Sequence, residues 1–397
     1  GRNMITIRPG SHVLTLLSIL PFVGEYPMSA LRLLGSVRSY KDLIHKLTQV
    51  QEFRFPDRDE RFTCRLLNVC GRGNRKTVRF HKSALPMLKW WDEDMYKLYM
   101  DEYDNHNFSG NARHINRNHL LAETAVMCLR AGVEANPLDT PDMLEDDIKM
   151  LRCANPFFYF AREVKRAYKE EMNKIRYTRL AGVLTLQDGV YTVYNLRNEV
   201  PNWMGEGESK VLWHMESMFY PIREEEHPYH RSALMFGENY DVALSLMQTI
   251  RETKKLDYGL FRSFFRIRYI PMNDFGVRFL RLVTSDNWRE NLLLSLFEPK
   301  QCTTSWGGLS FNVFVDGIDT YCFLDGDIRN LFNFRDTILM RNEGMLPSGT
   351  VRGHKVICYP EQLAFVQEFL GDLAEYATVT MDAVESALEL DRPSLID

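Results

Sequence analysis

The residues best suited to chemistry in this sequence are arginines and lysines gathered in one segment, between Ser36 and Lys82. That segment holds twelve Lys or Arg against five Asp or Glu, a net charge of +7, whereas the whole 397-residue chain carries −4. Cationic side chains concentrated in one part of an acidic protein indicate binding to the phosphates of a polyanion. The candidate DNA-binding residues are Arg38, Lys41, His45, Lys46, Arg54, Arg58, Arg72, Arg75, Lys76 and Arg79.

The elements expected around these residues are three helices followed by strands. Apolar spacing predicts helices over Val13–Phe22, after Pro27, and over Val37–Val50, the last one capped by Ser36. The strands and turns that follow are predicted at Glu52–Pro56, Phe62–Val69, Gly71–Lys76 and Thr77–Phe80. This order predicts a winged helix-turn-helix over residues 10–103, in which the third helix enters the major groove of double-stranded DNA and the wing contacts the backbone. A winged helix that binds another protein is the alternative.

The bulk composition is that of a folded chain. Hydrophobic residues make up 45% and charged residues 26%. No apolar run of 18 residues and no signal peptide are visible, so we expect neither a membrane span nor membrane binding. The seven cysteines are odd in number and form no CxxC pair, which favours reduced thiols and a cytoplasmic location over disulfides or zinc.

The remainder of the sequence predicts alternating strands and helices. Residues 104–117 are polar and predict a linker. Strands are expected over Ile175–Leu186 and Val190–Leu196, joined by Asp188-Gly189, and strand–helix alternation continues to Tyr376. The predicted fold class is therefore α/β (α+β), with an α/β core over 118–220 and a further α/β region of unknown role over 221–380. The acidic end, 385–397, is expected to fray.

A histidine near the start of a helix, in Arg117-Asn118-His119-Leu120, follows the predicted winged helix. With the small α/β core after it, this order resembles the replication-relaxation family and the MobC-type relaxases of mobilisable plasmids and integrative elements, over residues 10–220. The resemblance implies a DNA-binding protein of a plasmid, phage or integrative element. Its expected role is origin recognition, mobilisation (conjugation), replication or regulation, with other proteins of the same element as further partners.

The core of that family resembles the restriction-endonuclease fold, in which a helix supplies one acid, a strand an Asp, and the next strand acid-x-Lys. Carboxylates at those positions hold a divalent metal. In this sequence the acid of the helix corresponds to Glu123. The position of the first strand's Asp is occupied by Gly182 or Val183, and Asn195 and Arg197 stand where the next strand should carry the acid and the Lys. An amide and a guanidinium are not anionic ligands, so we expect a degenerate core without nuclease activity, metal or cofactor. A relaxase or nicking endonuclease using Mg²⁺ or Mn²⁺ is the alternative.

Four other groups of residues have a possible functional role and also a structural interpretation. Tyr191 and Tyr194 suggest a nucleophile, but no arginine cluster or histidine triad is evident around them, so core packing is expected. His227 and His230 follow three glutamates and predict a solvated turn. Arg266 and Arg268 alternate on a strand, which places both on one face as a second nucleic-acid surface or as a solvent face. Trp90-Trp91 lies in the predicted helix after the wing, which forms either a homodimer interface or simple packing contacts with the winged helix.

Overall fold

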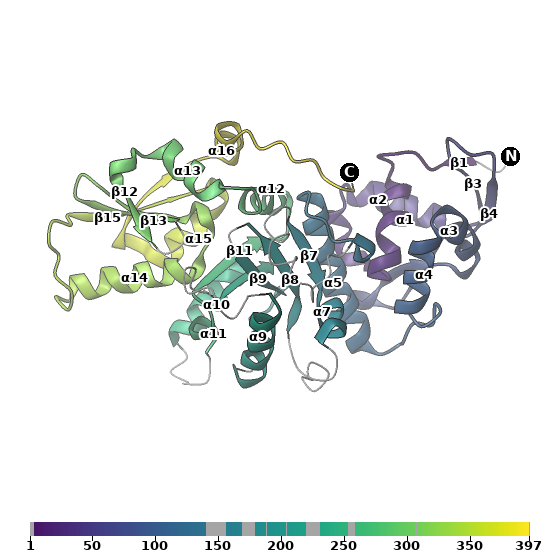
Figure 1. The fold of residues 1–397 in the computed structure, drawn as a ribbon, viewed down its shortest axis with the longest axis horizontal. Coiled ribbons are helices and arrows are strands. Elements are labelled where there is room, and N and C mark those ends of the chain that lie inside the picture. The colour runs from purple at the N-terminus through teal and green to yellow at the C-terminus, as the bar shows by residue number, and fades with distance from the viewer. Residues whose placement is uncertain are drawn as a thin grey trace. The chain divides into compact units, whose positions relative to one another are not determined.

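The computed structural model describes residues 4–139, 156–168, 179–187, 189–203, 205–219, 231–252, 259–305 and 308–396. The chain divides into two compact units: residues 1–140 with 393–397, and residues 141–392. The helices and strands form a mixed α/β structure, as the sequence predicts (Figure 1). Within the described ranges, no helix has both the length and the apolar character needed to cross a bilayer.

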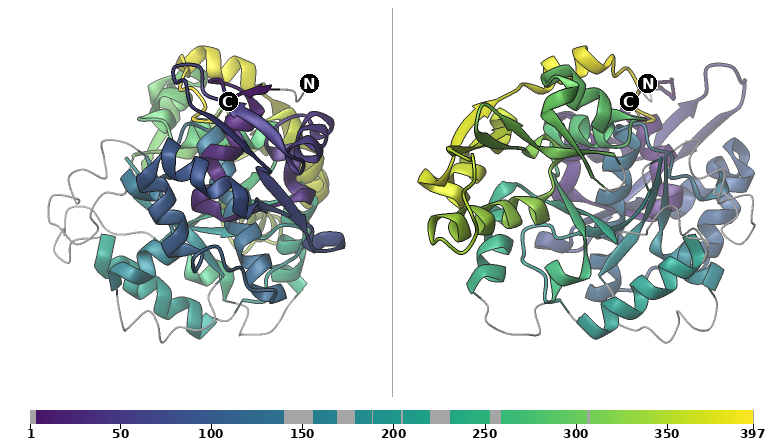
Figure 2. Two further views of the ribbon diagram at one scale, coloured as in Figure 1. Left: turned by 90° about the vertical axis from the view of Figure 1, so that its right-hand side faces the viewer. Right: turned by 60° about the vertical axis from the view of Figure 1, so that its left-hand side comes forward.

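The first unit combines helices with two small sheets, drawn in purple to blue in Figures 1 and 2. Its strands are β1 (Met4–Thr6), β2 (Glu25–Pro27), β3 (Gln51–Arg54), β4 (Arg61–Cys64), β5 (Leu67–Cys70) and β6 (Thr77–Phe80). Its α-helices are α1 (His12–Val23), α2 (Val37–Leu47), α3 (Leu85–Trp91), α4 (Glu93–Glu102) and α5 (Ala112–Arg130), and a 3-10 helix, η1, spans Met28–Leu33. Helix α1 is buried on nearly all sides and is central to the core of this unit. Helix α2 buries only one face, because its apolar residues recur at helical spacing.

The two sheets of this unit interleave along the chain. One sheet has the order β2-β6-β5, all antiparallel, with the turn 71–76 joining β5 to β6. The other has the order β1-β3-β4 and includes the β3–β4 hairpin. Helix α5 packs on β2, η1 and α1. The final residues belong to this unit, because the Leu395 amide donates to the Leu129 carbonyl and the Thr15 hydroxyl to the Ile396 carbonyl.

The second unit is built on two five-stranded sheets. The first half contains β7 (Phe157–Phe160), α7 (Ala161–Tyr168), β8 (Leu180–Leu186), β9 (Gly189–Asn195), α9 (Gly205–Phe219), β10 (Ser232–Gly237), α10 (Tyr240–Glu252), α11 (Leu260–Ser263), β11 (Arg266–Pro271) and α12 (Asp274–Val283). Helix α13 (Trp288–Leu296) follows it. The second half contains β12 (Cys302–Ser305), β13 (Gly308–Val315), β14 (Ile318–Cys322), α14 (Ile328–Asn342), β15 (Gly353–Cys358), α15 (Pro360–Leu370), β16 (Glu375–Thr378) and α16 (Met381–Leu388).

The two halves have the same topology. Strands run in chain order across each sheet. The first strand pairs antiparallel with the second and the second with the third, whereas the third, fourth and fifth strands pair in parallel. Helices follow the third, fourth and fifth strands in both halves. In the sequence, Asp188-Gly189 and Asp316-Gly317 stand at the same place in the central hairpins. The second unit therefore consists of two topologically equivalent halves, a repeat that was not predicted from the sequence.

Several predicted boundaries were wrong. The polar segment 104–117 is not a linker throughout, because α5 begins at Ala112, and the whole of α5 belongs to the first unit rather than to a core starting at 118. The boundary expected at 220 cuts through a sheet, since β10 pairs with β9. The predicted frayed end is helical as far as Leu388. Asp188, His227 and His230 lie outside the described residues.

Candidate nucleic-acid interface

Helix α2 presents an exposed basic face. The Ser36 hydroxyl caps it by accepting from the Ser39 amide at 3.3 Å, as expected of an N-cap residue. Tyr40, Ile44 and Leu47 are buried against the rest of the unit. The opposite side of the helix carries the four basic residues predicted from the sequence, and all four are exposed: Arg38, Lys41, His45 and Lys46.

The turn between β5 and β6 is a second exposed basic element. Arg72, Arg75 and Lys76 are all exposed there. Gly71 has φ +80°, and a Cβ at this position would lie 2.6 Å from the Arg75 carbonyl oxygen, so the turn needs glycine. The backbone closes through the Lys76 amide, which donates to the Gly73 carbonyl at 3.2 Å. The turn therefore holds three cationic side chains in solvent.

The β3–β4 hairpin contributes less than the sequence suggested. Arg54 is half-buried, and the Arg58 guanidinium lies 4.7 Å from the centre of the Trp90 ring. Trp90 also packs on Phe62, with ring centroids 5.0 Å apart, and Phe55 packs on Trp91. The two tryptophans thus pack within their own unit. The hairpin arginine Arg58 is exposed but already has a stacking partner.

Arg79 forms an ion pair with the buried carboxylate of Glu25. Its Nη2 donates to Glu25 Oε1 at 3.1 Å, and Glu25 is only 1% exposed. The other side of the guanidinium lies 4.4 Å from the centre of the Phe108 ring. We therefore correct the prediction for this residue: Arg79 stabilises the base of the β5–β6 hairpin and is not a free phosphate contact.

Glu25 joins the hairpin to α5. Besides Arg79, its oxygens accept from the Thr77 hydroxyl at 2.9 Å and from Asn118 Nδ2 at 2.8 Å, and His119 Nε2 lies 3.9 Å away. Both Thr77 and Arg79 stand on β6, whereas Asn118 and His119 stand on α5. This network has no signal in the sequence, because its members are up to 94 residues apart and none belongs to a short motif.

The three positions assigned to a degenerate nuclease site do not share one compact unit. Glu123 lies in the first unit, 5% exposed on α5, where its charge helps burial to raise the pKa of Tyr26. Asn195 and Arg197 lie in the second unit, at the end of β9, where Asn195 Oδ1 accepts from the Arg197 amide at 3.0 Å. Within the described residues, no three His, Cys, Asp or Glu side chains are grouped to hold a metal ion.

The strand that should carry the first aspartate has no room for one. A Cβ at Gly182 would lie 2.2 Å from the Tyr159 carbonyl oxygen on the paired strand β7. Val183 is fully buried. Neither position of β8 can therefore present a carboxylate to solvent or metal without rebuilding the sheet.

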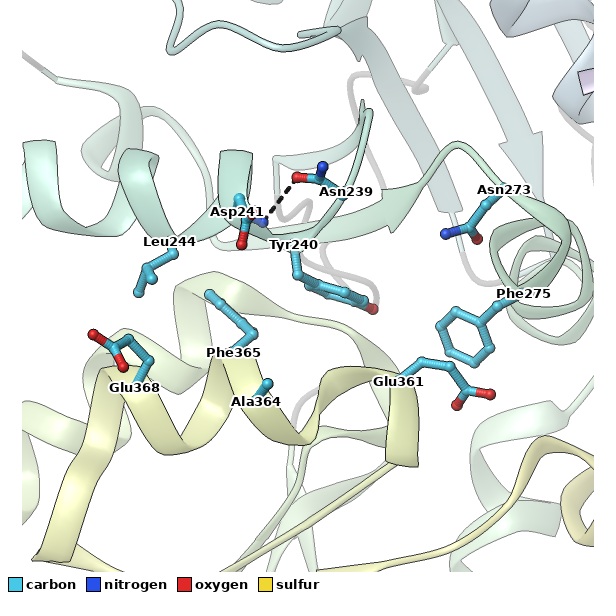
Figure 3. A pocket seen from close by; sticks show the side chains of 10 residues that line it. All are labelled: Asn239, Tyr240, Asp241, Leu244, Asn273, Phe275, Glu361, Ala364, Phe365 and Glu368. Atoms are coloured by element: carbon cyan, nitrogen blue, oxygen red, sulfur yellow. Dashed lines mark hydrogen bonds between the residues drawn. The ribbon is translucent and has the colours of Figure 1, made fainter. Parts of the chain in front are cut away.

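A surface cavity of about 450 Å³ opens where β10 and β11 end (Figure 3). Ligands of open α/β sheets often bind at the carboxyl ends of parallel strands. Asn239 and Asn273 begin the next helices there by accepting from the Asp241 and Gly276 amides. Asp241 and Glu361 stand in the first turns of α10 and α15, where helix dipoles favour negative charge. The two asparagines and the two acids at the cavity are therefore explained by their roles at the starts of helices. We assign no ligand to the cavity.

Comparison of the chain with protein-family models, with curated proteins and with solved structures finds no match. The geometry of the site is therefore the basis for a functional assignment.

Proposed function

We propose that the first unit is a winged helix that binds double-stranded DNA through α2 and the β5–β6 turn. The order of its elements supports this: α1, the short strand β2, η1 and α2 precede the hairpin, and β2 pairs with β6 in the sheet β2-β6-β5. The observation that carries the proposal is the exposure of seven basic residues on these two elements. They are Arg38, Lys41, His45, Lys46, Arg72, Arg75 and Lys76.

For the biological role, the proposal draws on the resemblance in element order to the replication-relaxation family described in the sequence analysis. We propose a cytoplasmic protein of a plasmid, phage or integrative element that recognises an origin or regulates the element. The mixed sheet of the first half, with β8 and β9 as adjacent antiparallel strands, fits an endonuclease-like scaffold. The crowding at Gly182 and the turn-forming role of Asn195 support a scaffold without cleavage chemistry.

The test is DNA affinity as a function of salt. Each phosphate neutralised by the protein contributes about −0.9 to the slope of log K against log salt. Arg75→Gln/Lys76→Gln should weaken binding to duplex DNA of any sequence and reduce the magnitude of the slope by about 2, roughly 1 for each lost contact.

A variant of equal net charge serves as the control. Arg262 and Lys300 are exposed in the second unit, so Arg262→Gln/Lys300→Gln removes the same charge elsewhere. The proposal requires that this control keep the wild-type slope. If both double variants change affinity equally, the effect is one of net charge, and the β5–β6 turn is not part of the interface.

A further inference from the structure

Strand β16 forms an open edge of the second half of the second unit. It stands last in the order β12-β13-β14-β15-β16, and its neighbour in the sheet is β15. The Val379 amide, just after β16, donates to the Cys358 carbonyl of β15 at 3.0 Å. Because backbone groups of alternate residues point to opposite sides of a strand, the amides of Tyr376 and Thr378 point away from β15. Neither amide has an acceptor among the residues that the structure describes.

The repeated topology allows β16 to be aligned with β11, the edge strand of the first half. Met272 follows β11, and its amide donates to the last residue of β10. Val379 follows β16, and its amide donates in the same way to the last residue of β15. These two residues are therefore at equivalent positions. Counting back along each strand, the equivalent pairs are Pro271 and Thr378, Tyr269 and Tyr376, and Arg268 and Glu375.

In the first half, the edge of β11 is covered by the segment Asp325–Asp327. The Tyr269 amide donates to the Gly326 carbonyl at 2.9 Å, and the Ile267 amide donates to Asp327 Oδ1 at 3.1 Å. Arg268 adds a side-chain contact, since its Nε donates to the Asp325 carbonyl at 3.2 Å. The edge of this kind of sheet can therefore bind a short extended segment through the outward-pointing backbone amides.

The charges of the two edge strands are opposite. Strand β11 carries Arg266 and Arg268, which also donate to Tyr191 Oη, so the arginines that the sequence did not show around this tyrosine are present in the structure. The segment that covers β11 contains two aspartates. At the position of Arg268, β16 has the exposed Glu375. The same complementarity predicts that a segment on the edge of β16 carries Lys or Arg.

The surroundings of β16 are acidic. From Pro360 to Asp391 the chain has eight Asp or Glu and no Lys or Arg. Three of these acids precede or begin β16 and are exposed: Glu368, Asp372 and Glu375. Lys355 of β15 lies opposite Glu375 in register, but no ion pair joins them within the described residues. This negative charge attracts a cationic partner and repels the same strand of a second copy.

We propose that the edge of β16 binds an extended, basic segment of a partner protein. The segment pairs with Tyr376 as Gly326 pairs with Tyr269, and its Lys or Arg side chains face Glu375. In strand addition of this kind, main-chain hydrogen bonds supply affinity and side chains supply specificity. The edge lies in the second unit, so the proposal does not depend on DNA binding by the first unit.

Peptide binding to the full chain tests this edge. The probe is a fluorescently labelled octapeptide of alternating lysine and valine, titrated by fluorescence anisotropy at fixed salt. We expect saturable binding by the wild type. A peptide of alternating lysine and proline has the same charge but cannot extend a sheet, and one of alternating glutamate and valine has the opposite charge. Both should bind at least about tenfold more weakly.

Two pairs of variants locate the binding surface. Tyr376→Pro removes the outward amide and should weaken binding of the lysine–valine peptide at least about tenfold. Thr378→Pro is its control and should bind as the wild type does, because Pro271 occupies the equivalent position of the covered strand β11. Glu375→Lys should also weaken binding at least about tenfold. Glu343→Lys changes an exposed acid elsewhere in the second unit and should retain binding.

Four results would overturn the proposal. The first is the absence of saturable binding of the lysine–valine peptide to the wild type. The second is equal binding by the wild type, Tyr376→Pro and Glu375→Lys. The third is equal binding of the lysine–proline peptide, which would reduce the effect to net charge. The fourth is a dimer of the protein alone that Tyr376→Pro dissociates in sedimentation, since the edge would then join two copies. Circular dichroism and the unfolding midpoint are measured for each variant, and Glu375→Lys decides the outcome if Tyr376→Pro unfolds.

Discussion

Arg79 and Glu25 form an ion pair across the β2–β6 strand pair, where they lie directly opposite each other in register. Their closest atoms are 3.1 Å apart, and the side chains are 15% and 1% exposed. Because Asn118 of α5 donates to the second oxygen of Glu25, this one carboxylate connects the hairpin, β2 and α5. A residue that looks like a phosphate contact in the sequence is thus a structural one.

The first prediction concerns this pair. Arg79→Ala leaves Glu25 buried without its main cation, and breaking a buried ion pair in this way typically costs about 3–5 kcal/mol. We expect a fall of that order in the free energy of unfolding of the first unit, measured by denaturant titration. Arg75→Ala, at an exposed position of the same hairpin, should change stability by less than about 0.5 kcal/mol. Comparable losses in the two variants would contradict the role given to Arg79.

The second prediction concerns sequence readout by α2. Arg38 is exposed in the first turn of that helix. In helix-turn-helix proteins, residues near the start of the recognition helix contact base edges, and a good bidentate contact contributes about 1–3 kcal/mol of discrimination. Arg38→Ala should therefore flatten the preference among sites selected from a random library. A loss that is uniform across all sequences would make Arg38 a phosphate contact instead.

The local elements of the first unit were predictable because their signals are short. Ser36 caps α2, Gly35 precedes it, and the glycines at 71 and 73 mark the turn, so the helix and hairpin follow from neighbouring residues. The exposure of the basic face of α2 followed from its periodicity. The roles of Arg58 and Arg79 did not, because Trp90 and Glu25, their partners, are brought to them only by folding.

The second unit was harder to predict because its information is long-range. Parallel pairing of β9 with β10 depends on residues some 40 positions apart, so the boundary placed at 220 had no local signal against it. The predicted shared face of Arg266 and Arg268 is confirmed by their common acceptor, Tyr191. The alternative that this face is exposed to solvent is wrong for Arg268, because α13 and its Trp288 cover it.

The third prediction concerns pH. Asp325 and Asp327 are both buried, and burial raises the pKa of both carboxyls, with Asp325 adding to the effect on Asp327. Arg266, Arg268, Arg289 and Tyr321 also face them. A folded-state pKa above the unfolded value near 4 means that the folded protein binds the proton more tightly. This contribution to stability is present at low pH and is lost as the pH rises toward neutrality.

Asp327→Asn tests the sign of that effect. Asparagine keeps an oxygen that can accept from the Ile267 and Arg329 amides, as Asp327 Oδ1 does, but it has no charge to bury. We expect the variant to gain stability relative to the wild type at pH 7 and little or none at pH 4, measured as the difference in free energy of unfolding. Asp241→Asn, at an exposed helix start, should show no such gain at neutral pH. A larger gain at pH 4 than at pH 7 would reverse the sign and refute the assignment.

The fourth prediction concerns Gly182 itself. Any side chain there would approach the Tyr159 carbonyl oxygen, since the Cβ alone would lie 2.2 Å away. Gly182→Ala should destabilise the second unit by about 1–3 kcal/mol, in the range for overpacking a well-packed interior. Gly110→Ala is the matched control, because nothing lies within 4 Å of a Cβ at that position. Equal stability of the two variants would show that β7 and β8 can move apart and that β8 has room for an acid.

The last prediction is the absence of DNA cleavage. Supercoiled plasmid incubated with the protein and Mg²⁺ or Mn²⁺ should stay intact, because metal-dependent cleavage needs two or three carboxylates on one ion. Here Gly182 has no space for one, Asn195 holds a turn, and Glu123 is buried beside Tyr26 in the other unit. Glu123→Gln is assayed in parallel and should behave as the wild type does. Nicked product that appears with metal and disappears in Glu123→Gln would instead establish a nicking enzyme and place Glu123 at its active site.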